Sequence, residues 1–157
     1  GASLRLQAER LARGDASGNG SRLEAYHDRV REAVVARLEP AHLAAVHRAL
    51  AEALAAAGDA DPERLMVHWE GAGDTARAAE LARVAAERAT RAVAFARAAQ
   101  LYEKALALGS WPAEKRAELA VALGNARAAD GRGAAAARAY LDAAPEVDPA
   151  MARDLRR

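Results

Sequence analysis

The sequence predicts an all-α protein built as an antiparallel helical repeat array. Small and aromatic positions recur 38 residues apart with unchanged gaps: Ala86, Ala98, Tyr102 and Ala105, then Gly124, Ala136, Tyr140 and Ala143. Alanine dominates the apolar residues, with one Phe, two Trp and three Tyr, and strand-favouring residues are scarce. The connections between the periodic apolar segments are short, so neighbouring helices should run antiparallel.

Residues 1–38 are predicted to form a small unit of their own, in which residues 14–21 are a Gly-, Asp-, Asn- and Ser-rich loop. Residues 22–26 are expected to form a short strand that pairs across this loop with residues 4–11. Residues 4–13 could equally form a helix. The sequence leaves these alternatives open.

The first helix should follow this loop, with an apolar stripe of Val30, Ala33, Val34 and Leu38, and should end at Pro40. Residues 39–157 are expected to be helical repeats. Their first stripe comprises Leu43, Val46, Leu50, Leu54 and Ala57 and is closed by Gly58.

The later helices are predicted from their start and stop signals. In Asp61-Pro62-Glu63, Asp caps the free amides, Pro sits where no donor is needed, and Glu faces the helix dipole. Asp148-Pro149 repeats this signal, and Gly131 and Gly133 bracket a tight turn. The expected helices span about 61–71, 74–90, 92–108, 113–130 and 133–144.

The 38-residue recurrence resembles the tetratricopeptide repeat, with the clearest copies at 79–112 and 117–150. The second copy carries the family's Leu-Gly pair as Leu123-Gly124, whereas the first has Ala85-Ala86 but keeps the later motif from Phe95 to Leu106. Four residues beyond the usual period fit at Gly109-Ser110-Trp111-Pro112. The large aromatics that usually open and close the family's first helix are replaced by Ala82, Ala89, Ala120 and Arg127. The resemblance implies a TPR-like superhelix that binds other proteins.

A second resemblance covers residues 22–108, through the ordered stretches Tyr26 to Val34, His47 to Ala51 and His68 to Asp74. They look like the region that follows the ATPase module in large bacterial STAND-type signalling proteins, which are often linked to serine/threonine kinases. In that family the first stretch ends a winged-helix-like unit, which would make residues 3–38 its remnant. The resemblance implies the sensing or scaffolding arm of such a regulator.

Charge and composition argue against several classes of function. The 23 basic and 22 acidic residues nearly cancel, so no overall field favours nucleic acid or anionic membrane. Without cysteine, disulfides and thiolate metal sites are excluded. We find no transmembrane run and no signal peptide, so a cytoplasmic location is expected. The opening Gly1-Ala2-Ser3 and the stop at Arg157 suggest a piece of a larger protein.

No catalytic or cofactor-binding constellation is recognisable, so we expect neither enzymatic activity nor a cofactor. Neither Lys104 nor Lys115 follows a phosphate-binding glycine loop. The four serines lie in termini or turns, without a nucleophile elbow. The histidines lack metal-ligand spacing, and His47 and His68 are interpreted as helix-packing residues.

The alternative function is DNA binding or transcription regulation through the winged-helix remnant. Its arginines could contact phosphates: Arg5, Arg10, Arg13, Arg22, Arg29 and Arg31. Acidic residues are interleaved with them, so no basic face accumulates, and this remains the minority interpretation.

The favoured function is a non-catalytic interaction or regulatory scaffold that binds a protein, a peptide or other domains of its parent; homo-oligomers are compatible with it. The first helix of a tetratricopeptide hairpin lines the groove. By resemblance, the groove residues are Arg83, Glu87 and Arg91 in one repeat and Glu118, Val121 and Asn125 in the next. Glu87 makes a carboxylate clamp doubtful. A mixed-charge row of this kind can also be merely solvated.

Two tryptophans are further contact candidates. Trp69 shares its helix face with Leu65 and is expected to pack inside, whereas Trp111 precedes Pro112 in a turn and is the better candidate for an exposed contact.

Overall fold

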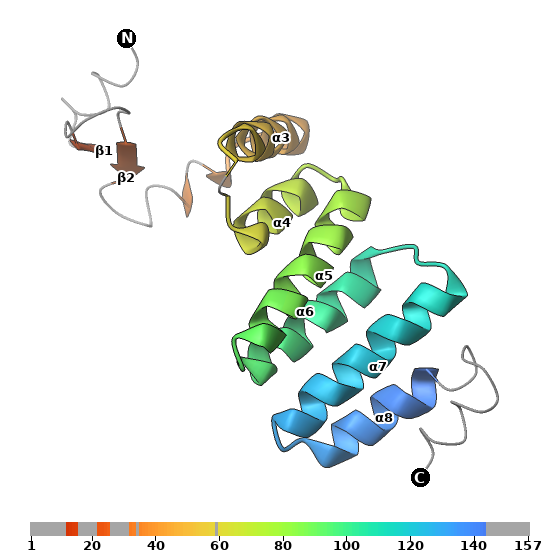
Figure 1. Ribbon diagram of the computed structural model, residues 1–157. Coiled ribbons are helices and arrows are strands. Elements are labelled where there is room, and N and C mark those ends of the chain that lie inside the picture. The colour runs from red at the N-terminus through yellow and green to blue at the C-terminus, as the bar shows by residue number, and fades with distance from the viewer. Residues whose placement is uncertain (1–11, 16–21, 26–31, 34, 59, 144–157) are drawn as a thin grey trace. The chain divides into compact units, whose positions relative to one another are not determined.

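The computed structural model of the chain describes residues 12–15, 22–25, 32–33, 35–58 and 60–143 (Figure 1). The chain forms two compact units, which divide between Leu43 and Ala44. The predicted boundary at residue 38 remains a prediction.

The first unit contains a two-stranded antiparallel hairpin of β1 (Ala12–Asp15) and β2 (Arg22–Ala25). Ala12 lies opposite Ala25, and Asp15 lies opposite Arg22. The expected strand at 22–26 is confirmed, but its expected partner at 4–11 is wrong, because β2 pairs with β1. This pairing closes a shorter loop, which costs less chain entropy, and sets opposite charges across the strands. Residues 4–11 lie outside the described residues.

Part of the predicted first helix, residues 28–31 and 34, lies outside the described residues. Residues 32, 33 and 35 are helical, and the amide of Ala36 donates to the carbonyl of Glu32 at 2.9 Å. Pro40 begins the next helix, α3 (Pro40–Ala56), where its missing N–H costs nothing.

Five further helices follow: α4 (Pro62–Gly71), α5 (Thr75–Arg91), α6 (Phe95–Leu108), α7 (Ala113–Ala129) and α8 (Gly133–Ala143). They confirm the five expected helices, with each end displaced by at most three residues. From α4 to α8, each helix packs on the next along the chain, and Figure 1 shows the resulting row of helices. Apart from its hairpin, the described chain is therefore an all-α, TPR-like helical repeat array, as predicted.

The two acidic residues that precede α4 and α5 differ in whether they cap the helix. The Asp74 carboxylate accepts from the amide of Arg77 at 3.0 Å and caps α5. Asp61 precedes α4 without a side-chain cap bond; its carboxylate lies 3.5 Å from Arg88 instead. The cap expected at Asp61 is therefore wrong. Asp148 and Pro149 lie outside the described residues.

A left-handed residue occupies the turn between paired helices. Gly73 has φ +79° in the α4–α5 turn, and Gly131 has φ +77° in the α7–α8 turn, as expected. In the α5–α6 turn, at the repeat position of Gly131, stands Val93, with φ +60° and 69% of its surface exposed. A β-branched residue is strained in this conformation.

The core is made of closely approaching small residues. Ala86, Ala98 and Ala105 are fully buried beside Tyr102. In the second repeat a Cβ added at Gly124 would lie 2.3 Å from the Tyr140 ring. Small residues thus sit where helices touch, and the aromatics pack against them, which confirms the role predicted for the recurring set.

Candidate functional site

A cleft of about 360 Å³ is formed by residues of α5, α6 and α7. Phe95 and Tyr102 lie two turns apart on one face of α6. Positions three and four residues apart on α7 supply another wall. The lining comprises Thr90, Phe95, Tyr102, Ala122, Asn125, Ala126 and Ala129. An apolar cleft with a few polar atoms is suited to hold a side chain and orient its backbone.

Asn125 is the residue that links the cleft to the predicted groove. Its Oδ1 accepts a hydrogen bond from the Tyr140 hydroxyl at 2.8 Å, so α8 orients the amide of α7. The side-chain NH₂ can then donate to a carbonyl oxygen entering the cleft. The hydroxyl of Thr90 donates to the carbonyl of Ala86 at 2.9 Å. The side-chain NH₂ of Asn125 is therefore a donor that a ligand in the cleft can use.

The predicted row on α5 is an ion cluster. Nε of Arg83 lies 3.1 Å from both carboxylate oxygens of Glu80, and Nη1 of Arg83 is bonded to Glu87. These hydrogen bonds, to Glu80 foremost, raise the pKa of Arg83 above its ordinary value despite partial burial. The bond from Arg83 lowers the pKa of Glu80. Only 18% of the Arg83 side chain is exposed, so its charge is largely committed within α5.

This cluster changes how the groove can be tested. If these residues line the groove, reversing Arg83 and Arg91 to Glu is expected to weaken partner binding by about 1 kcal/mol or more and to leave helicity and melting temperature nearly unchanged. Reversal of Arg83 would instead set a third carboxylate beside Glu80 and Glu87, so a loss of binding could reflect a loss of stability. Arg91 is exposed, so reversing its charge tests the groove without placing a carboxylate in this ion cluster.

The predicted rows of α5 and α7 are connected electrostatically. The charge of Lys115 on α7 contributes to the lowered pKa of Glu80 on α5. Nζ of Lys115 also lies 2.7 Å from Glu118. Val121 is half-buried, and Glu118 and Asn125 are exposed. The two rows therefore present alternating charges at one end, while at the other Asn125 borders the cleft.

Both tryptophans have structural contacts. Trp69 is 6% exposed, as expected for a packing residue, and the Arg77 guanidinium lies 4.3 Å from its ring centroid. Trp111 is half-buried, and its Nε1 donates to the carbonyl of Ala105 at 2.8 Å. A Cβ added at Gly109 would lie 2.2 Å from this indole. Trp111 thus fastens the α6–α7 connection, and its role as an exposed contact stays a prediction.

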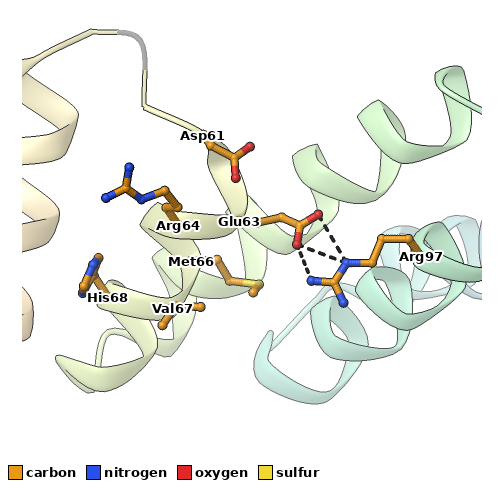
Figure 2. A pocket seen from close by; sticks show the side chains of 7 residues that line it. All are labelled: Asp61, Glu63, Arg64, Met66, Val67, His68 and Arg97. Atoms are coloured by element: carbon orange, nitrogen blue, oxygen red, sulfur yellow. Dashed lines mark hydrogen bonds and ion pairs between the residues drawn. The ribbon is translucent and has the colours of Figure 1, made fainter. Parts of the chain in front are cut away.

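A second recess, of about 320 Å³, lies beside α4 and α6 (Figure 2). Its lining comprises Asp61, Glu63, Arg64, Met66, Val67, His68 and Arg97. Glu63 of α4 accepts from Nε of Arg97 of α6 at 3.1 Å, and this bond raises the pKa of Arg97. Figure 2 shows this ion pair reaching across from one helix to the other. The ion pair connects α4 to α6, so we assign these residues a structural role.

The described part of the chain contains neither a cluster of metal ligands nor a membrane-spanning helix. Within residues 12–15, 22–25, 32–33, 35–58 and 60–143, no three His, Asp or Glu side chains gather as metal ligands. None of the helices described there is both long and apolar enough to cross a bilayer.

Sequence reasoning identified Asn125 as a groove residue but did not recognise the cleft beside it. The signal was present in the three- and four-residue spacing of Ala122, Asn125, Ala126 and Ala129. Alanines at that spacing are equally typical of residues buried in a helical core.

No family model matches the chain, and no curated protein matches it. A solved structure of the N-terminal domain of stress-induced protein-1 (STI-1) from C. elegans is similar, with 19% sequence identity and a TM-score of 0.48. The match covers 76% of this chain and 99% of that one.

Proposed function

We propose that this chain is a protein-interaction module that binds a peptide segment of a partner in the cleft between α5, α6 and α7. The supporting observation is the oriented amide of Asn125 at the edge of a mostly apolar cleft. An extended segment would place an apolar side chain between Phe95 and Ala126 and a backbone carbonyl at the Asn125 amide.

The charged row on α5 and α7 constrains the partner further. Arg83 is engaged by two glutamates, and Lys115 by Glu118, so this row offers no excess of cations for an acidic segment. The partner should therefore be of mixed charge. Its affinity should come mainly from the apolar anchor, with the charges contributing orientation and association rate.

Selection from a displayed library of random 12-residue peptides on the full chain tests this proposal. The enriched peptides should share an apolar anchor, and their dissociation constants can be measured by calorimetry. Ala129→Trp adds bulk at an exposed position of the cleft and should weaken binding at least tenfold. Ala107→Trp is the matched control, because Ala107 is also exposed on a helix but does not line the cleft.

Failure to enrich any peptide would overturn the proposal. Equal dissociation constants for the Ala129→Trp variant and the unmodified chain would also overturn the placement of the ligand in the cleft. Circular dichroism of both tryptophan variants should show unchanged helicity, because both substitutions are at exposed positions.

We further propose that the module works as a regulatory arm of a larger cytoplasmic bacterial signalling protein that carries an ATPase or kinase. The resemblance of residues 22–108 to the region behind such ATPases supports this context. Nucleotide chemistry would then lie outside this chain, so the chain itself should neither bind nor hydrolyse ATP. Saturable micromolar binding of ATP in calorimetry would contradict that assignment.

A further inference from the structure

Helix α3 is attached to the array by few contacts. Ala51 is its one buried residue, while Val46 and Leu50 are 37% and 44% exposed. Two polar contacts reach α4 and the residue after it. His47 is hydrogen-bonded to His68, and Nη2 of Arg48 donates to the carbonyl of Ala72 at 3.3 Å. So small a buried surface makes the attachment sensitive to either polar contact.

The histidine pair requires at least one neutral ring. Nδ1 of His47 and Nδ1 of His68 are 3.1 Å apart, and the ring centroids are separated by 5.3 Å. One Nδ1 must donate its hydrogen while the other accepts through its lone pair. The His47 ring is also held close to α4, because a Cβ added at Gly71 would lie 2.6 Å from it. With both rings protonated, two N–H groups and two positive charges would face each other at this distance.

The groups around the pair do not favour a second proton. Burial, the charge of His47 and the charge of Arg64 all lower the pKa of His68, in that order. Arg48 adds a cation from α3. The recess that His68 lines contains two carboxylates and a further cation: Asp61, Glu63 and Arg97. Glu63 is bonded to Arg97, and Asp61 lies 3.5 Å from Arg88, so both carboxylates have cationic neighbours of their own.

We propose that α3 is a pH-sensitive cap on α4, docked when the His47–His68 hydrogen bond is intact and released when both rings are protonated. Release would uncover Ala51 and the surface of α4 beneath α3, while α4 to α8 stay folded through contacts of their own. This inference does not depend on the peptide-binding proposal.

The sign follows from proton linkage. The released state has the ordinary histidine pKa, whereas in the docked state the pKa of His68 is lower, so the released state binds more protons in acid. The docking contribution is complete above the ordinary histidine pKa of about 6.5 and is lost as the pH falls toward the lowered value. Each unit of pKa difference changes the released-to-docked ratio about tenfold.

Spin labels on the full chain can measure this release. The chain has no cysteine, so Ala53→Cys on α3 and Ala107→Cys on α6 give one labelled pair at exposed positions. Double electron–electron resonance should show one narrow distance distribution at about pH 7.5. At about pH 5 it should show a second, broad population that is larger than at pH 7.5. The α-helical circular dichroism should fall by no more than the share of α3.

Two substitutions separate the histidine pair from general acid effects. His47→Asn retains a hydrogen-bonding amide near Nδ1 but cannot become charged, so it should abolish the broad population at pH 5. His42→Asn is the matched control, because His42 lies on the same helix and is exposed; it should leave the response intact. The proposal is overturned by an unchanged distribution at pH 5, by a response that survives His47→Asn, or by melting of the whole array.

Discussion

Gly124→Ala tests the close approach of α7 and α8. Alanine in a helix interior is more favourable than glycine by about 1 kcal/mol, so helix propensity alone predicts stabilisation. The new Cβ would lie 2.3 Å and 2.6 Å from the Cε1 and Cδ1 atoms of Tyr140. Such overpacking costs about 1–3 kcal/mol. Moving the ring also breaks the hydrogen bond from the Tyr140 hydroxyl to Asn125. A buried hydrogen bond contributes about 0.5–1.5 kcal/mol, and this one contributes less because it is exposed. We expect net destabilisation of about 1–2 kcal/mol.

A double-mutant cycle with Tyr140→Ala makes this prediction sharp. Without the ring there is space for the new methyl group, so Gly124→Ala should then stabilise the array by about 0.5–1 kcal/mol. Free energies of unfolding from urea titrations, followed by far-UV circular dichroism, give both legs of the cycle. If Gly124→Ala has the same sign in both backgrounds, the Gly124–Tyr140 contact does not constrain the helices as argued.

Further outcomes follow from other contacts. Val93→Gly should stabilise by about 1 kcal/mol, because it relieves a left-handed β-branched residue that is 69% exposed; thermal unfolding would show a raised midpoint. Ala98→Leu should cost about 1–3 kcal/mol in urea unfolding, because Ala98 is fully buried. Trp111→Phe should cost about 1 kcal/mol through its lost bond to a backbone carbonyl. Arg83→Gln should raise the pKa of Glu80 toward its ordinary value in an NMR titration, so that less of the stability present at neutral pH is lost on acidification.

The helical array was predictable because its signals are local. Small residues such as Ala98 and Ala136 recur at fixed distances from tyrosines, and Gly131 marks a turn that needs a left-handed residue. These features act within one hairpin and need no knowledge of distant contacts. Element type, order and approximate bounds therefore followed from the sequence.

Side-chain partners were not predictable in the same way. Asp61 has the sequence context of a cap, yet its carboxylate lies near Arg88, 27 residues later in the chain. Arg83 has carboxylates within reach three residues before it and four residues after it, and it engages both. The alternative ion pairs that a long charged side chain can form differ in free energy by only tenths of a kcal/mol, so sequence spacing alone cannot tell which pair forms. Val93 gave no turn signal, because its residue type disfavours the conformation that the repeat imposes.

The order of packing along the array has a kinetic consequence. From α4 to α8, each helix packs mainly on the helix that precedes or follows it in the chain. Contacts between near neighbours in sequence close only short loops, so any one hairpin can nucleate and recruit the next, and folding should be rapid. Amide hydrogen exchange should then be slowest in α5, α6 and α7, which pack on a helix on each side, and faster in α8 at the end of the array.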